Sequence, residues 1–125
     1  MAKINEYLSY IQEQETDHFI GVDLDGTLAY YEGWVNGETI GRPIPRMISF
    51  VKHLITEGHK VKIFTARATD PRNVPAIKKW LLDNGLQDLE VTCVKDPMMK
   101  VFYDDKAVQV EKNTGRLLGS PDLVI

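Results

Sequence analysis

Apolar residues along the chain follow a helical period in three segments. This spacing predicts amphipathic helices over residues 3–15, 47–55 and 74–82. The second helix has Pro45 near its start, a position that proline tolerates, and Gly58 is placed to end it. For the third helix, Asn73 is the expected cap and Gly85 the expected stop. The first helix is expected to pack on the core.

Four shorter apolar runs predict β-strands, over residues 19–22, 60–65, 89–94 and 101–103. The first run does not alternate with polar residues, which is typical of a strand buried on both faces. Because the strands alternate with helices, we expect a parallel sheet with right-handed crossover connections. The predicted fold class is therefore α/β, with a single doubly wound parallel sheet of the Rossmann-like kind.

Two turn signals predict β-hairpins beside this sheet. Asn36-Gly37 favours a type I′ turn, which predicts a hairpin flap over residues 32–40, after the first strand. Near the C-terminus, residues 107–110 and 116–118 are expected to pair around a turn at residues 113–115.

Length and composition are those of an ordinary globular protein. The 125 residues are enough for one domain, so we expect a single domain over residues 1–125. With 43% hydrophobic and 26% charged residues, the composition suggests neither disorder nor a membrane protein. The N-terminal residues lack the continuous apolar run of a signal peptide, so we expect a cytoplasmic location and no membrane partner. The oligomeric state is left open.

Charge and cysteine content narrow the possible functions further. The net charge of −3 argues against a surface that coats nucleic acid, although basic residues concentrate between positions 60 and 80, as on a solvated helix face. Cys93 is the single cysteine, so no internal disulfide can form and a zinc cluster of thiolates is excluded. Its apolar neighbours predict a buried thiol.

Polar side chains follow four of the predicted strands, at the edge where open α/β sheets bind their ligands. These residues are Asp23, Asp25, Thr65, Arg67, Lys95, Asp104 and Asp105. Four carboxylates at one edge repel one another unless a cation joins them, so we expect a hard divalent ion. A ligand set made of oxygen favours Mg²⁺ over zinc, and none of the three histidines is expected at this edge.

The order of these residues resembles the motifs of the haloacid dehalogenase-like (HAD) phosphatases. The run Asp23-Leu24-Asp25-Gly26-Thr27-Leu28, after an apolar strand, is similar to the first motif of that family. Thr65, a later lysine and Asp104-Asp105 are similar to its second, third and fourth motifs. The resemblance covers residues 19–105, and it implies the HAD fold, Mg²⁺ as cofactor and hydrolysis of phosphomonoesters.

The resemblance assigns a role to each catalytic residue. Asp23 would attack phosphorus to form an aspartyl-phosphate, and Asp25 would protonate the leaving oxygen and later activate water. Thr65 would donate to the phosphoryl oxygens, and Lys95 would balance their charge. Lys95 is preferred to Lys100 because it follows the third strand at its catalytic end, whereas Lys100 precedes the fourth strand.

The resemblance also implies metal ligands and substrate contacts. The expected ligands of Mg²⁺ are Asp23, Asp25 and Asp105, with Asp104 as the second choice on the fourth strand, and the main-chain carbonyl of Leu24. The expected substrate-binding residues are Thr27, Ala66 and Arg67.

The chain leaves no room for the cap domain that many HAD enzymes carry, because the two segments into which caps are inserted are short. An uncapped site admits a small phosphorylated metabolite or a nucleotide or polynucleotide end, and both stay open. Arg67 resembles the arginine of capless polynucleotide 3′-phosphatases and could clamp a phosphate. Tyr30, Tyr31 and Trp34 could stack on a base or sugar, or pack on the core of the flap itself.

Two other classes of protein share part of this pattern. A phospho-receiver domain also combines carboxylates, threonine, lysine and Mg²⁺, but its acidic pair follows the first strand, whereas here the pair Asp104-Asp105 comes last. A non-catalytic phosphate-binding or adaptor module on the same fold stays open, because a fold does not guarantee activity.

Overall fold

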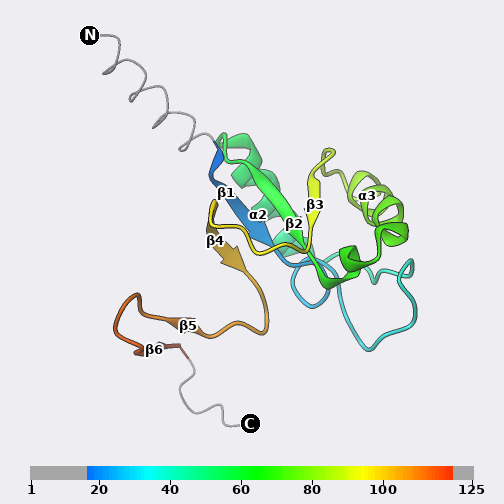
Figure 1. The fold of residues 1–125 in the computed structure, drawn as a ribbon. Coiled ribbons are helices and arrows are strands. Elements are labelled where there is room, and N and C mark those ends of the chain that lie inside the picture. The colour runs from blue at the N-terminus through cyan, green and yellow to red at the C-terminus, as the bar shows by residue number, and fades with distance from the viewer. Residues whose placement is uncertain (1–16, 120–125) are drawn as a thin grey trace, which may run out of the picture.

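The computed structural model describes residues 17–119, and their centre is a four-stranded parallel sheet (Figure 1). Its strands are β1 (Phe19–Val22), β2 (Val61–Phe64), β3 (Glu90–Thr92) and β4 (Met99–Tyr103). The strand order is β3-β2-β1-β4, and all three neighbouring pairs are parallel. The carboxyl ends of the strands therefore lie at one edge of the sheet. The helix predicted over residues 3–15 lies outside the described residues.

Two α-helices connect the first three strands. Helix α2 (Pro45–Thr56) joins β1 to β2, and α3 (Val74–Asp83) joins β2 to β3 after two short 3₁₀ turns, η1 (Ala66–Thr69) and η2 (Pro71–Asn73). Helix α2 begins at its proline, as predicted, and it ends before Gly58, which has a φ of 89°. The two 3₁₀ turns were not predicted.

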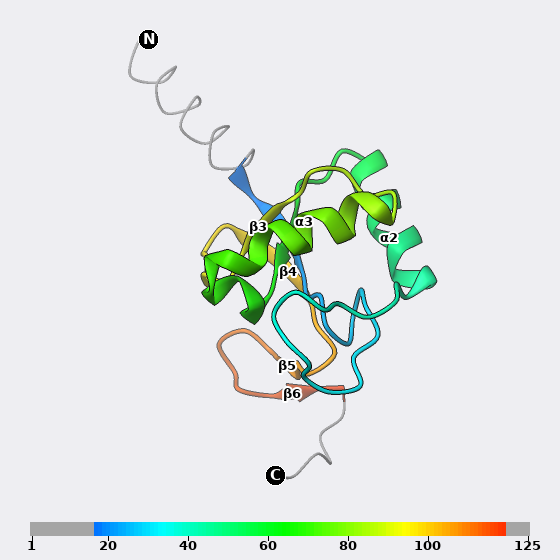
Figure 2. The same cartoon turned by 90° about the vertical axis from the view of Figure 1, so that its right-hand side faces the viewer.

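Side chains from both helices pack on the same face of the sheet. Ile20 and Val22 of β1 are one alternation apart, and they join one buried core with Val51 of α2 and Ile77 of α3. The connection from β3 to β4, residues 93–98, contains no helix. Figure 2 shows this connection on the side of the strands opposite to α2. The α/β class and the parallel sheet are confirmed, whereas a helical layer on the second face is not found within residues 17–119.

The C-terminal hairpin is confirmed, but the flap hairpin is not. Strands β5 (Gln109–Val110) and β6 (Leu117–Leu118) form a separate antiparallel pair. Over residues 32–40 the structure has no strand. Neither Asn36 nor Gly37 takes the positive φ that a type I′ turn requires. Instead, Asn36 Oδ1 accepts hydrogen bonds from the main-chain N–H groups of Glu38 and Thr39, at 2.9 and 2.8 Å, so a side chain closes this turn.

Two smaller predictions also need correction. Asn73 precedes α3 as expected, but its side chain does not cap the helix. It donates instead to the carbonyl of Arg67, at 3.1 Å, and so ties the start of α3 to η1. Cys93 lies just after β3 and is only partly buried, because this edge strand has a single neighbour. Within residues 17–119, no helix combines the length and apolar character needed to cross a bilayer.

Candidate functional site

The acidic cluster forms where β1 and β4 end side by side. The main-chain N–H of Asp23 donates to the carbonyl of Tyr103, at 2.9 Å, so β1 and β4 end at the same level of the sheet. Asp23, Asp104 and Asp105 each place one carboxylate oxygen within 4.8 Å of the others. The structure therefore brings together three of the four expected carboxylates, and Asp25 lies outside this group.

A tight turn after β1 sets the direction of these side chains. The carbonyl of Leu24 accepts from the N–H groups of Leu28 and Ala29, both at 2.9 Å, and from that of Thr27 at 3.3 Å. These main-chain donors occupy the carbonyl that the resemblance implied as a metal ligand. The turn needs Gly26, whose φ is 88°, and a Cβ there would lie 2.5 Å from Asp105 Oδ2.

Asp23 is the carboxylate most affected by these surroundings. Burial, the negative charge of Asp104 and the neighbouring Asp105 together raise the pKa of Asp23 from 3.8 to about 7, although the N–H of Leu24 acts in the opposite direction. The pKa of Asp23 thus lies close to neutral pH, and a cation bound at the cluster would favour the ionised form. A compact set of carboxylate oxygens that lacks positive charge fits a hard cation such as Mg²⁺.

Thr27 connects the two acidic strand ends. Its hydroxyl accepts from the main-chain N–H of Asp105 at 3.0 Å, and it lies 3.4 Å from Asp23 Oδ2 and 3.3 Å from Asp105 Oδ1. One hydroxyl proton can be donated to only one of these carboxylates at a time. The contacts of this buried threonine are therefore with the acidic cluster, where it orients two prospective metal ligands.

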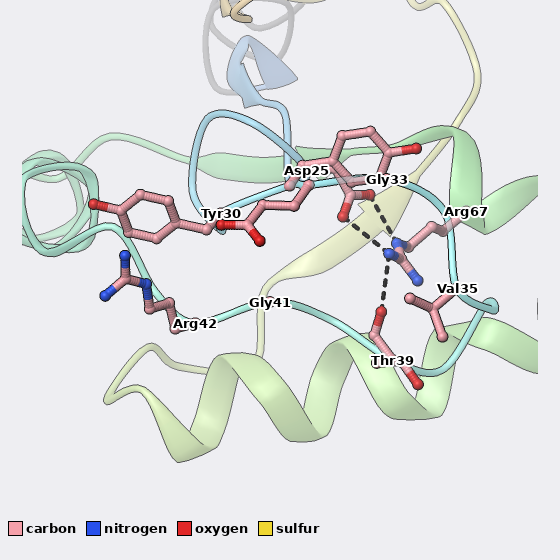
Figure 3. A pocket seen from close by; sticks show the side chains of 10 residues that line it. Asp25, Tyr30, Gly33, Val35, Thr39, Gly41, Arg42 and Arg67 are labelled. Carbon is pink, nitrogen blue, oxygen red and sulfur yellow. Dashed lines mark hydrogen bonds and ion pairs between the residues drawn. The ribbon is translucent and has the colours of Figure 1, made fainter.

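Asp25 has a different partner, the buried guanidinium of Arg67 (Figure 3). Arg67 Nε and Nη2 donate to the two carboxylate oxygens of Asp25, at 2.7 and 3.0 Å. Nη1 and Nη2 also donate to the carbonyls of Asn36 and Thr39, at 2.9 and 3.1 Å. Arg67 was predicted to contact substrate. Its nitrogens here fix the orientation of Asp25 and tie it to the loop of residues 30–42.

Thr65 and Ala66 lie where the prediction placed them, directly after β2 at the same edge. The buried hydroxyl of Thr65 accepts from the main-chain N–H of Arg67 at 3.2 Å, which leaves its proton free for another acceptor. Thr65 and Ala66 both line a cleft of about 610 Å³ that also reaches Asp23, Asp25 and Asp104. This volume is in the range of small-molecule sites.

The two candidate lysines differ in position, as strand direction requires. Lys95 is exposed in the loop after β3, and it is not among the residues that line the cleft. Lys100 lines a separate cavity of about 620 Å³ with His18, His59 and Lys60, at the amino ends of the strands. Lys106, which sequence reasoning missed, lines the cleft instead. Its position directly after Asp105 is the signal that could have identified it.

Aromatic side chains form much of the remaining wall of the cleft. Tyr31 and Trp34 come from the loop, and Phe64 and Phe102 come from the ends of β2 and β4. The two phenylalanines were not predicted as site residues, although Phe64 directly precedes Thr65 and Phe102 lies two residues before Asp104. Tyr30 does not line this cleft. It borders a second cavity of about 390 Å³, where the Arg42 guanidinium lies 4.0 Å from the centre of its ring (Figure 3).

Comparison with known proteins supports the fold. The structure is similar to that of a conserved protein from Bacteroides thetaiotaomicron, with a TM-score of 0.55 and 22% sequence identity. The match covers 71% of this chain and 76% of that protein. At this identity the likeness concerns the fold alone. No protein-family model matches the chain, and no curated protein matches it either.

Proposed function

We propose that this chain is a Mg²⁺-dependent phosphomonoester hydrolase of the HAD-like type, which acts through an aspartyl-phosphate on Asp23. The acidic cluster supports this function most directly. It holds Asp23 against Asp104 and Asp105, and burial together with these two neighbours raises the pKa of Asp23 to about 7. A phosphate ester could approach these carboxylates only if a cation joined them.

The residues of the cluster would share the binding of Mg²⁺. Asp23, Asp104 and Asp105 supply the carboxylate oxygens, and Thr27 orients two of them. When bound, the ion would neutralise the phosphoryl oxygens and favour the ionised, nucleophilic form of Asp23. Thr65 and Lys106 line the same cleft and supply a hydroxyl and an ammonium group for the remaining charge.

Two carboxylates then divide the chemistry. An oxygen of Asp23 forms a bond to phosphorus as the ester P–O bond breaks, and the leaving oxygen takes a proton from Asp25 or from water. Asp25 next removes a proton from a water molecule that attacks the aspartyl-phosphate. This step releases inorganic phosphate and restores Asp23. Arg67 holds both oxygens of Asp25, so that its orientation is fixed through both steps.

Hydrolysis of 4-nitrophenyl phosphate tests this function. We expect turnover with Mg²⁺, none in excess EDTA, and recovery when Mg²⁺ is restored. Asp105→Ala should lower kcat/KM by about 10²-fold or more, because it removes a ligand and leaves Asp23 without its neighbour. Asp88→Ala is the matched control, since Asp88 is exposed and pairs with Lys78.

The outcomes separate the two candidate functions. Full turnover in EDTA would overturn the proposed metal site. A folded protein that binds Mg²⁺ and phosphate without turning over any ester would instead support the phosphate-binding or adaptor module.

A further inference from the structure

Four aromatic side chains line the cleft beside the acidic residues, namely Tyr31, Trp34, Phe64 and Phe102. Three of them are exposed to solvent, although a site for phosphate alone needs no aromatic surface. Trp34 is 60% exposed, Tyr31 43% and Phe102 37%. They come from two segments far apart in the sequence, the loop of residues 30–42 and the end of β4, yet they line the same cleft. Exposed aromatic surface gathered around a polar centre is typical of a binding site.

Two of these rings already contact other side chains of the protein. The Arg67 guanidinium lies 4.9 Å from the centre of the Trp34 ring, and Arg67 is itself held by Asp25 and two carbonyls. Phe102 contacts Phe64 edge to face, with ring centres 5.1 Å apart. Rings that are already ordered lose little conformational entropy when a ligand stacks on them.

The charges of the cleft limit what else the ligand can carry. Its lining contains four aspartates, Asp23, Asp25, Asp70 and Asp104. Asp70 pairs with Arg72, and Arg67 is already engaged by protein acceptors. Lys106 is the cation of this lining for which no ion pair is found within residues 17–119. One ammonium group and one metal ion suit a single phosphate, but they do not suit a chain of phosphates.

We infer that the substrate is a monophosphate ester whose organic group is a planar aromatic ring system, stacked in the cleft against Trp34 and Phe102. The inference rests on the proposed function and specifies its substrate class. An aryl group and a nucleoside base share this chemistry. The acidic cluster would hold the phosphate through the cation bound to it, and the rings of the loop and of β4 hold the organic group beside it.

A pair of esters with the same kind of leaving oxygen isolates stacking from leaving-group chemistry. 2-Phenylethyl phosphate and 2-cyclohexylethyl phosphate are both esters of primary alcohols, and they differ in the ring alone. The phenyl ring is planar and aromatic, whereas the cyclohexyl ring is puckered, saturated and more hydrophobic, so simple burial would favour the cyclohexyl ester. We expect wild type with Mg²⁺ to favour the phenyl ester by roughly fivefold or more in kcat/KM, the lower end of what one stacked ring contributes. Trp34→Ala and Phe102→Ala should each bring this ratio toward one.

Tyr30→Ala is the matched control, because Tyr30 is an exposed aromatic residue of the same loop that borders the other cavity. It should leave the ratio of the two esters at its wild-type value. Equal kcat/KM values for the two esters in wild type would overturn the inference. So would a wild-type preference that survives in both Trp34→Ala and Phe102→Ala.

Binding without turnover distinguishes failure of this inference from failure of the proposed function. The chain has two tryptophans, so Trp80→Phe leaves Trp34 as the single tryptophan, whose emission can be excited selectively over that of the tyrosines. Saturable quenching by the phenyl ester at lower concentration than by the cyclohexyl ester would support stacking even if neither ester is hydrolysed. Turnover of both esters without any such quenching would refute stacking and leave the hydrolase standing.

The effect of Trp34→Ala on other monophosphate substrates identifies the chemical source of the aromatic group. If nucleoside monophosphates are turned over with the same dependence on Trp34, the stacked group is a base. If dependence on Trp34 is confined to aryl esters, it is an aromatic group of another kind. Turnover that is faster for an oligonucleotide end than for either, and insensitive to Trp34→Ala, would overturn the inference.

Discussion

Asp23 and Asp25 are two residues apart and lie in opposite electrostatic surroundings. Asp23 faces Asp104 and Asp105, and its pKa is raised to about 7. Asp25 faces Arg67, which donates to both of its oxygens. Asp25 thus has a cation from its own chain, whereas Asp23 faces two further carboxylates. In the proposed mechanism this contrast would let a single short turn present one acid to a metal and orient its neighbour for proton transfer.

The largest expected effect separates the two aspartates by their chemistry. Asp23→Asn removes the nucleophile, so it should abolish turnover and never carry phosphate. Asp25→Asn keeps the nucleophile but loses the base that activates water, which should slow turnover by about 10²- to 10⁴-fold. With 4-nitrophenyl phosphate, whose leaving group needs no proton, Asp25→Asn should therefore accumulate the aspartyl-phosphate.

Mass spectrometry of intact protein after a brief reaction and acid quench measures this difference. We expect one added phosphoryl group on Asp25→Asn and none on Asp23→Asn. If neither variant carries phosphate while wild type turns over, or if labelled water is shown to attack the substrate directly, the covalent route is excluded and only the metal site is left.

The next effect concerns the ion pair between Asp25 and Arg67. Arg67→Met keeps much of the side-chain volume but leaves Asp25 and the carbonyls of Asn36 and Thr39 without their donors. Removal of one partner from a buried pair costs about 3 kcal/mol in the free energy of unfolding. Urea denaturation measures this loss. Arg67→Lys should recover only part of it, because an ammonium cannot reproduce the bidentate contact.

Arg72→Met is the matched control for this variant. Arg72 also pairs with an aspartate, Asp70, but the pair is exposed to solvent. Its removal should leave the urea midpoint where it is in wild type. A loss of equal size in both variants would show that the burial of the Arg67 pair is not what stabilises the loop.

The acidic cluster was predictable from sequence and the ion pair was not, for a physical reason. Asp23 and Asp104-Asp105 follow apolar strands, and parallel strands bring their carboxyl ends together whatever the side chains do. The pairing of Asp25 with Arg67 depends on side-chain direction after a turn and a 3₁₀ segment, 42 residues apart. Strand order alone contains no information about such directions.

The hairpin predicted over residues 32–40 was wrong because it relied on local sequence alone. Asn36-Gly37 commonly forms a hairpin turn, but here the Asn36 side chain accepts from the main chain, and a Cβ at Gly37 would clash with Asn73 Oδ1. Tertiary contact with the start of α3 decided the conformation of this loop. The wall of the cleft formed by Tyr31 and Trp34 was for that reason only partly predictable.

The smallest expected effect is the pH dependence of stability without metal, and it follows from the pKa of Asp23. In the unfolded chain this carboxyl has its ordinary value of 3.8, and in the folded protein it is raised to about 7. The folded state therefore binds the proton more tightly, and the stability that this proton contributes is complete below pH 3.8 and lost as the pH rises toward 7.

Between pH 5 and 7 the free energy of unfolding in EDTA should fall with a slope of at most about 1.4 kcal/mol per pH unit, which is the limit for one proton. The slope should be smaller than this limit because Asp23 is partly solvated. Asp70 and Glu111, whose pKa values are lowered by Arg72 and Arg116, are already ionised in this window. Asp23→Asn isolates the contribution of Asp23, since the other side chains are the same in wild type and variant. Urea denaturation at intervals of half a pH unit should show a steeper fall in the free energy of unfolding for wild type than for Asp23→Asn.

Saturating Mg²⁺ should flatten this pH dependence in wild type alone, because the ion replaces the proton. A wild-type slope that equals that of Asp23→Asn in EDTA would show that the folded protein does not hold this proton, and the contrast between Asp23 and Asp25 would then rest on geometry alone.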